Sequence, residues 1–291
     1  MGDCIYCGLP AGFLRRRHKE CQQKAEAEAA ERKAVIDLAE GNVRATAGAA
    51  LAGQLPLEVL PEKLTNIIHG AGLDGQRARQ LLISAWCETV DAALDNGLID
   101  ESEENRLAGY LNTLSIDREE VDADGHFGRM VKGALLNDLH AGRLPNRLNI
   151  IDRLPINLQA GEHIVWVWRN TRYLEDRVRR DRVGGSQGVS IRIMSGVYYR
   201  VGGFKSRPVD VAERIHVDTG MLIATDRNLY FAGPVKSTRI PYAKIVTFDP
   251  YSDGIGLTRD ALTAKPQIFV TDDGWFTYNL VTNLAQRAVS R

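Results

Sequence analysis

The stretch GMLIATDRNLYFAG, residues 220–233, indicates the fold class of the second half of the chain. Two apolar runs with β-branched and aromatic residues flank the turn-forming segment TDRN, and this pattern is typical of a β-hairpin. Similar short runs surround it, and Gly, Asp, Asn or Pro punctuates most of the joins. These runs are HIVWVW, VSIRI, GVYYRVG, ERIHV, STRIP, KIVTF, GIGLT and QIFVT. We therefore predict an antiparallel β domain over residues 156–291.

A helical pattern, WFTYNLVTNLAQRAV, follows the last of these strands. Phe276, Leu280, Leu284 and Ala288 fall on one helical face. We expect this helix to plug the open end of a small β-barrel or sandwich, with Trp275 among the side chains that fill it.

The β region resembles bacterial pleckstrin-homology-like (GRAM-like) domains. These often carry a Gly-x-Leu-x-x-Thr-x-x-Arg-Leu-x-Phe strand pair, then a basic Arg-Ile-Pro strand and an Ile…Asp-Gly-Ile hairpin. Asn228 stands where many relatives carry Arg. The resemblance implies a PH-like fold, and such domains bind phosphoinositides, peptides or no known ligand, so the fold alone does not give a function. The matching residues are Gly220, Leu222, Thr225, Leu229, Phe231, Arg239, Ile240, Pro241, Ile245, Asp253, Gly254 and Ile255.

A basic surface in this region is a candidate site for anionic lipid head groups or another partner. Six arginines and three acids lie between Trp166 and Arg182, and GGFKSRP adds two cations. Lys and Arg that converge on one loop bind phosphate groups. The alternating charges of RYLEDRVRRDR are also explained by a solvated strand or helix face, and this is the interpretation that we favour. The candidate residues here are Arg177, Arg179, Arg180, Arg182, Lys205 and Arg207.

Residues 43–155 have the pattern of an all-α domain with about five helices. Apolar residues recur at i, i+3 and i+4 between positions 76 and 96, and Asn96-Gly97 is a helix-stop signal. Asp100 followed by Glu103 predicts a capping box, and a further helix is expected over 126–140.

The turn in this domain, DNGLIDESEENRL, resembles that of tellurite-resistance B-like (TerB-like) helical domains. In those domains an Asp-x-Gly-x-Leu/Ile turn precedes a cap and two acidic residues. The resemblance implies an all-helical fold, which sometimes binds metal through surface carboxylates. No complete EF-hand loop is present, and helix capping explains the same carboxylates. The matching residues are Asp95, Gly97, Leu98, Ile99, Asp100, Glu103 and Glu104.

Near the N-terminus, CIYCGLPAGFLRRRHKEC, residues 4–21, has the spacing of a metal site. Two residues between ligands let both side chains of a pair face one ion, and three Cys with one His suit zinc. Cys4, Cys7, His18 and Cys21 would complete a tetrahedral site, which is therefore structural. The alternative is a redox Cys-x-x-Cys, but no βαβ pattern surrounds it.

A segment as short as 1–22 cannot bury a core, so zinc would supply most of its folding free energy, about 10 kcal/mol. A connecting helix is expected over 23–42, with Gly41 and Asn42 as its stop. Arg15, Arg16 and Arg17 form a basic edge that either contacts a partner or is simply solvated.

Composition narrows the function classes. The 37 basic and 37 acidic residues give zero formal net charge, which argues against general nucleic-acid binding. The sequence lacks an export signal and an apolar run long enough to span a membrane, so we expect a cytoplasmic protein that is at most peripheral to the membrane. It also lacks the P-loop, nucleophile-elbow, HExxH and GxGxxG motifs, so we expect no enzyme activity.

Together these features predict a multidomain α+β protein with a structural zinc module, an all-α middle domain and a PH-like β domain. The expected function is that of a non-catalytic adaptor that binds protein partners through its zinc and PH-like modules. The family resemblances imply a bacterial stress-response or phage-defence setting. The alternatives are a peripheral membrane protein that binds anionic lipid, and an enzyme whose site is not recognised. The sequence does not indicate an oligomeric state.

Overall fold

The computed structural model describes residues 2–12, 16–151, 154–186, 189–194, 197–201, 204–261 and 265–289. The side chains of Asn96, residues 177–213 and Val289 are outside this description. The chain divides into two compact units, residues 1–137 and 138–291, and the four-part division expected from the sequence is finer than this. A helical unit followed by a sheet unit confirms the mixed α+β class.

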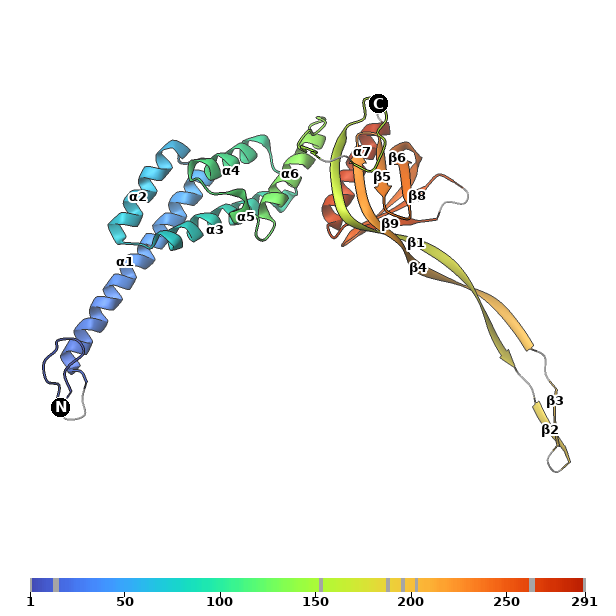
Figure 1. Cartoon of the computed structure of the whole chain (residues 1–291), viewed down its shortest axis with the longest axis horizontal. Helices are drawn as coiled ribbons and strands as arrows, with labels where there is room; N and C mark the ends of the chain where they lie inside the picture. Colours follow the sequence, from blue (N-terminus) through green and yellow to red (C-terminus); the bar gives the residue numbers. More distant parts are fainter. Residues whose placement is uncertain are drawn as a thin grey trace. The chain divides into compact units, whose positions relative to one another are not determined.

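The first unit is helical in its described part (Figure 1). Its α-helices are α1 (Lys19–Leu51), α2 (Leu60–Ala71), α3 (Gly75–Ala93), α4 (Glu101–Thr113), α5 (Arg118–Val121) and α6 (His126–His140). Two 3₁₀ turns, η1 (Leu57–Val59) and η2 (Leu94–Asn96), join some of them. The helix predicted over 126–140 is therefore confirmed.

Helix α1 does not stop at Gly41 and Asn42, so the predicted helix end was wrong. Gly in a helix interior costs about 1 kcal/mol relative to Ala. Beyond this point α1 buries Val43 and Ala47 against the other helices, and this burial outweighs the cost of one glycine. The end of α1 is therefore set by tertiary packing and not by the low helix propensity of Gly41.

The core of the helical unit is centred on Trp86 of α3 and Tyr110 of α4, both fully buried. The indole N–H of Trp86 donates to the Leu107 carbonyl at 3.0 Å, and the Tyr110 hydroxyl donates to the Leu82 carbonyl at 3.2 Å. Each aromatic ring thus fills the core while its polar atom bonds to the backbone of the other helix. These two bonds fix α3 against α4.

The start of α4 confirms the predicted capping box. The Asp100 carboxylate accepts from the Glu103 backbone N–H at 2.8 Å, and the Glu103 carboxylate accepts from the Asp100 N–H at 2.9 Å. Gly97 just before it has φ = 77°, the left-handed conformation that glycine tolerates at a helix end.

The second unit contains a seven-stranded antiparallel sheet in the order β6-β5-β4-β1-β9-β8-β7. Strands β6 and β7 are its two edges and do not pair with each other, so the sheet is open. The strands are β1 (Ile164–Ser186), β4 (Phe204–Thr225), β5 (Asn228–Ala232), β6 (Ser237–Pro241), β7 (Ile245–Tyr251), β8 (Gly254–Arg259) and β9 (Gln267–Val270). A 3₁₀ turn, η3 (Tyr242–Lys244), joins β6 to β7.

The predicted hairpin over 220–233 is confirmed. Leu222 of β4 pairs with Phe231 of β5, and Ala224 pairs with Leu229, so the turn falls within TDRN. β4 is longer than expected, because ERIHV and GMLIATD form one strand.

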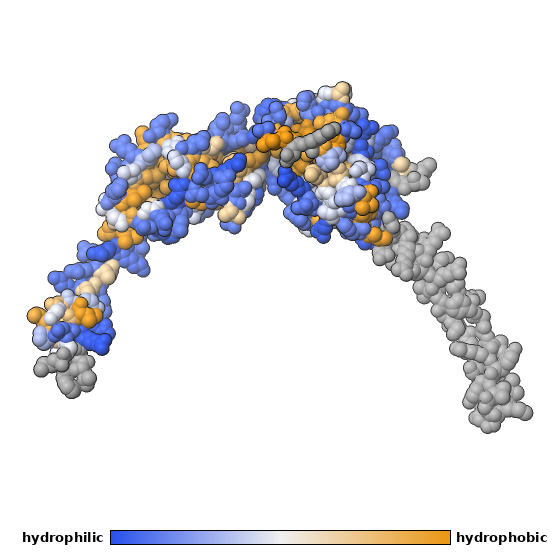
Figure 2. Space-filling view, viewed as in Figure 1, coloured by the Kyte–Doolittle hydropathy of each residue, from blue (hydrophilic) through white to orange (hydrophobic). Residues whose placement is uncertain are grey.

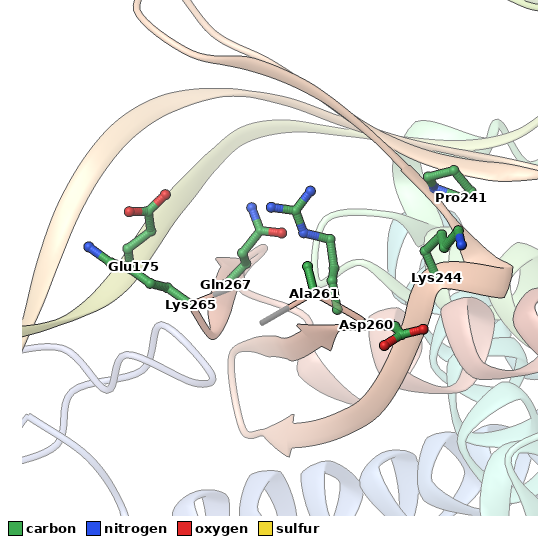
Figure 3. Close-up of a pocket in the computed structure, with 8 residues that line it drawn as sticks. Glu175, Pro241, Lys244, Asp260, Ala261, Lys265 and Gln267 are labelled. Carbon is green, nitrogen blue, oxygen red and sulfur yellow. The ribbon is translucent and has the colours of Figure 1, made fainter. Parts of the chain in front are cut away.

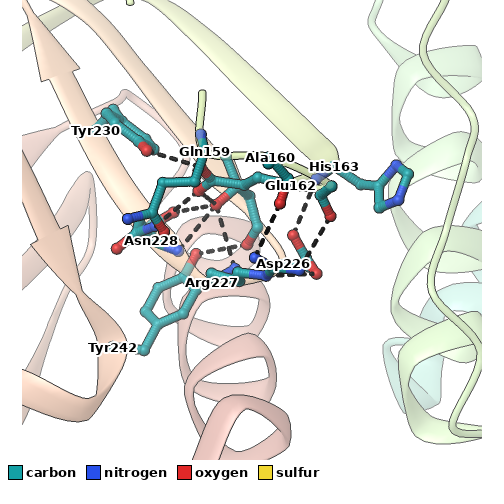
Figure 4. Close-up of polar contacts among 11 residues, drawn as sticks. Gln159, Ala160, Glu162, His163, Asp226, Arg227, Asn228, Tyr230 and Tyr242 are labelled. Atoms are coloured by element: carbon teal, nitrogen blue, oxygen red, sulfur yellow. Dashed lines mark hydrogen bonds and ion pairs between the residues drawn. The ribbon is translucent and has the colours of Figure 1, made fainter. Parts of the chain in front are cut away.

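A buried glutamate holds this turn (Figure 4). Glu162 is 7% exposed, and its Oε1 accepts from the Thr225 hydroxyl at 2.5 Å and the Asn228 amide at 2.7 Å. Its Oε2 accepts from the Tyr230 hydroxyl and the Gln159 backbone N–H, both at 2.8 Å. Four donors therefore compensate for the burial of one carboxylate.

Helix α7 (Gly274–Val289) covers one face of the sheet (Figure 1). Phe276 is fully buried, and its ring meets that of Trp166 edge-on at 4.9 Å between centroids. Leu280 and Leu284 are buried on the same helical face, as predicted. Trp275 was wrongly assigned to the core: it is 46% exposed, because it lies one residue, about 100°, around the helix from Phe276.

Strands β1 and β4 extend past the rest of the sheet as a two-stranded ribbon (Figure 1). β1 pairs with β9 only at Arg172–Glu175 among the described residues, and from Asp176 to Ser186 it pairs with β4 alone. A short hairpin of β2 (Val189–Met194) and β3 (Val197–Val201) follows between them in the chain.

Candidate metal centre

The four predicted metal ligands come together at the start of α1. The Sγ atoms of Cys4, Cys7 and Cys21 and a ring nitrogen of His18 all lie within 4.8 Å of one another. Cys4 is buried, Cys7 is exposed, and the other two are half-buried. They form the only such group of three or more potential ligands among the described residues.

A tight turn positions the first two cysteines. The Gly8 N–H donates to the Cys4 carbonyl at 2.8 Å, and the Cys4 N–H donates to the Leu9 carbonyl at 2.7 Å. Gly8 has φ = 72°, a conformation that glycine adopts without a steric cost. Asp3 pairs with Pro10 on either side of the turn, so the loop is closed at its base. We call residues 2–12 together with 16–21 the knuckle.

The start of α1 positions the other two ligands. His18 is the N-cap residue and Cys21 lies in the first turn, so the three-residue spacing places them on one side of the helix. The His18 backbone N–H also lies 3.4 Å from Cys4 Sγ, which links the helix start to the turn.

The His18 ring is oriented for metal binding. Its Nε2 lies 3.1 Å from the Pro10 carbonyl oxygen, an acceptor, so Nε2 carries the proton in this bond. In a neutral ring Nδ1 then keeps its lone pair, and Nδ1 lies 3.4 Å from Cys7 Sγ and 3.8 Å from Cys21 Sγ. Second-shell carbonyls that fix a ligand tautomer are common at metal sites. Sequence reasoning missed Pro10, because a backbone acceptor leaves no residue-type signal.

Two of the ligand spacings are compatible with a tetrahedral metal ion such as zinc. Bonds of about 2.3 Å to sulfur and 2.0 Å to nitrogen, with tetrahedral angles, separate a sulfur and a nitrogen ligand by about 3.5 Å. The distances from His18 Nδ1 to Cys7 Sγ and Cys21 Sγ, 3.4 and 3.8 Å, lie on either side of this value. With four protein ligands, such a site leaves no position for a reacting water and supplies folding free energy.

The surroundings of the cluster shift the pKa values of the Cys4 and Cys21 thiols. Burial would raise the pKa of Cys4, but backbone N–H groups of His18, Tyr6 and Cys7 lower it to about 6. A hydrogen bond to Cys7, burial and charge repulsion raise the pKa of Cys21 to about 11. A divalent cation at the centre would remove the repulsion and favour all three thiolates.

The knuckle exposes apolar side chains to solvent. Ile5, Tyr6 and Leu9 are 68%, 45% and 63% exposed. Figure 2 shows hydrophobic colour on this part of the chain beside the hydrophilic colour of charged residues. Arg16 and Arg17 are exposed next to it, and Arg15 lies outside the described residues.

The basic surface predicted from the remaining candidates stays a prediction. The side chains of Arg177, Arg179, Arg180, Arg182, Lys205 and Arg207 lie outside its described part. Their strands pair along the ribbon, with Arg182 opposite Pro208 and Arg207 opposite Val183. Arg172, at the base of the ribbon, lies 3.5 Å from the carboxylate of Asp272.

No family model, curated protein or solved structure matches this chain. None of the helices in the described ranges is both long enough and apolar enough to cross a membrane. The knuckle is therefore the candidate functional site of the described residues.

Proposed function

We propose that this chain is a non-catalytic adaptor whose zinc-folded knuckle presents an apolar surface to a protein partner. The observation that carries the proposal is the convergence of four protein ligands on a module whose large apolar side chains face solvent. A site with four protein ligands is of the structural kind. The module's contribution to function is then its surface.

The exposed apolar residues support a binding role. A module this small has too few residues to bury a hydrophobic core, so zinc rather than burial would hold it together. Ile5, Tyr6 and Leu9 are thereby left available for an interface. Aromatic and aliphatic anchors surrounded by polar groups are typical of interface centres.

The surrounding charge favours an acidic partner surface. Arg16, Arg17 and Lys19 are exposed beside the apolar residues, and Asp3 and Glu20 are the exposed acids nearby in sequence. Cations at an interface rim steer acidic partners and add specificity more than affinity.

The finer assignments belong to the same proposal. An all-helical unit with the Asp100–Glu103 capping box supports a TerB-like middle domain. An antiparallel sheet covered by one terminal helix supports a PH-like C-terminal domain. The bacterial stress-response or phage-defence setting follows from these resemblances and rests on them alone.

The test is affinity purification of the full-length chain from its native host, with three versions compared. The double variant Ile5→Ser/Leu9→Ser removes the apolar knuckle surface, and Val235→Ser removes an 82% exposed apolar residue on the sheet unit as the matched control. We expect a specific partner to be lost from the double variant and retained by the control, with the zinc content of both unchanged. An identical set of captured proteins from all three versions would contradict the proposal.

A further inference from the structure

We propose that a cavity in the sheet unit binds a small ligand that carries a phosphate group. The cavity has a volume of about 360 Å³ and lies where the end of β8, the start of β9, η3 and the base of the β1–β4 ribbon meet (Figure 3). Its charged and polar lining residues are Lys244, Arg259, Lys265, Glu175, Asp260 and Gln267. Cavities of this size are at the lower end of the range that holds small ligands.

Three cations of the cavity have no anionic partner in the described part of the chain. Lys244, Arg259 and Lys265 come from three separate segments, and none of them forms an ion pair with a described residue. Other exposed arginines of this unit do find carboxylates, as Arg214 does with Asp176 at 3.2 Å. In Figure 3 the ammonium group of Lys265 lies on the side of Glu175, and that of Lys244 lies at the opposite end, near Asp260. Unpaired cations that line a cavity can bind phosphate oxygens.

The two acids of the cavity offset the three cations only in part. The Glu175 carboxylate accepts a 2.5 Å hydrogen bond from the buried hydroxyl of Tyr173. That hydroxyl in turn accepts from the Gln267 amide at 2.6 Å. Asp260 is exposed, and in Figure 3 its carboxylate points away from Gln267. The cavity therefore keeps an excess of one positive charge, with Glu175 held at one side.

Two buried polar atoms of the cavity residues also lack partners. Gln267 is 3% exposed, and among the described residues its Oε1 has no hydrogen-bond donor and Nε of Arg259 has no acceptor. Leaving such buried groups unpaired costs stability, so their presence beside a cavity favours a ligand that supplies what is missing. A phosphate can accept from the guanidinium, and a neighbouring hydroxyl or a protonated phosphate oxygen can donate to the amide oxygen. This complementarity indicates a phosphomonoester, either soluble or as a lipid head group.

In the experiment, the full-length chain is titrated with inorganic phosphate and, in parallel, with chloride at equal ionic strength. Calorimetry measures the binding in both titrations. A second arm uses phosphatidylcholine vesicles with and without phosphatidic acid, which distinguishes a lipid head group from a soluble ligand. The variants are Lys244→Gln, Lys265→Gln and Arg259→Gln, with Lys236→Gln, an exposed cation outside the cavity, as the matched control.

We expect saturable binding in at least one phosphate-bearing arm, weakened about tenfold by Arg259→Gln and several-fold by either lysine variant. Lys236→Gln should bind like the unaltered chain. Lys244 and Lys265 are exposed, so their variants remain informative even if Arg259→Gln does not fold. Binding no tighter than that of chloride in the first arm, together with no binding to acidic vesicles, would overturn the proposal. So would an equal loss in the Lys236→Gln control.

Discussion

The knuckle and the TDRN hairpin both place side chains around a tight turn, but they are stabilised differently. In the hairpin, Glu162 accepts three hydrogen bonds from Thr225, Asn228 and Tyr230, and the strands lie on a buried aromatic core. In the knuckle, backbone bonds close the turn, and the larger side chains face solvent. The two regions differ in size: a unit large enough to bury a core is stabilised by one, whereas a module of about twenty residues has too few residues for a core, and we propose that a metal takes its place.

The aromatic core of the sheet unit makes this contrast concrete. Tyr173, Phe231 and Phe269 come from three different strands, and their ring centroids lie 5.0 to 5.7 Å apart. Such clusters bury large apolar areas and add favourable ring–ring contacts. Nothing comparable lies within the described knuckle, where Cys4 and Ala11 are the buried apolar residues.

The largest expected effect is the loss of a metal ligand. Cys4→Ser should unfold the knuckle, because it removes a contribution of about 10 kcal/mol from a module without a core. Amide hydrogen exchange should show loss of protection for residues 2–12 and 16–18 only, while both compact units keep their thermal transitions. Cys87→Ser is the control, because Cys87 packs beside the helical core and not in the cluster. If Cys4→Ser left knuckle protection intact, the metal would not be what folds it.

The next largest effect is expected from a void created in the core of the sheet unit. Phe276→Ala should lower the free energy of unfolding of this unit by about 3–5 kcal/mol, because the fully buried ring leaves a void. Trp275, the residue before Phe276, is half-exposed, so Trp275→Ala should lower the free energy of unfolding far less. Thermal and denaturant unfolding measure both. Zinc content should not change in either variant, and a loss of zinc from Phe276→Ala would contradict the independence of the two regions.

A smaller effect is expected at the turn itself. Burial would raise the pKa of Glu162, but hydrogen bonds from Asn228, Thr225, Gln159 and Tyr230 lower it below its usual 4.5. The ionised form therefore stabilises the fold above pH 4.5, and this contribution is lost as pH falls through the lowered pKa. Glu162→Gln should cost about 1–3 kcal/mol at pH 7.

The same variant should also flatten the loss of stability in acid, which urea titrations at pH 7 and below pH 4.5 will reveal. Asp249→Asn, at an exposed carboxylate on β7, is the control and should leave the acid profile unchanged. An acid profile of Glu162→Gln that matches the unaltered chain would argue against the assigned role of this carboxylate.

The smallest effect is expected in the part of α1 that connects the knuckle to the packed helices. Residues 23–38 contain no buried side chain, whereas Ala47 of the same helix is fully buried. Ala30→Gly should cost about 1 kcal/mol of local helix stability, visible in amide exchange over 23–35, without shifting the main thermal transition. Ala47→Gly carries the same propensity cost plus lost packing, and should shift that transition. Equal shifts of the thermal transition in both variants would mean that residues 23–38 of α1 are packed against the rest of the unit.

Much of this architecture follows from local patterns. The strand runs, the TDRN turn, the capping box at Asp100 and the metal-ligand spacing each depend on a few neighbouring residues, and each appears in the structure. Periodicity also identified the apolar face of α3, because a helix buries residues at fixed intervals.

What the sequence did not predict depends on contacts between distant residues. Helix α1 runs through Gly41 because Val43 and Ala47 find a core formed later in the chain. Glu162 carries no motif, and its three side-chain partners lie more than sixty residues away. The cavity beside Arg259 combines segments whose cations are individually ordinary surface residues. Such sites have no local signature, because the fold alone brings them together.

The most direct test of the central claim is elemental analysis of the full-length chain, purified without chelators from its native host. The account predicts about one zinc ion per chain, released by Cys4→Ser and retained by Cys87→Ser. Less than about half a zinc per chain under these conditions would contradict a metal-folded knuckle.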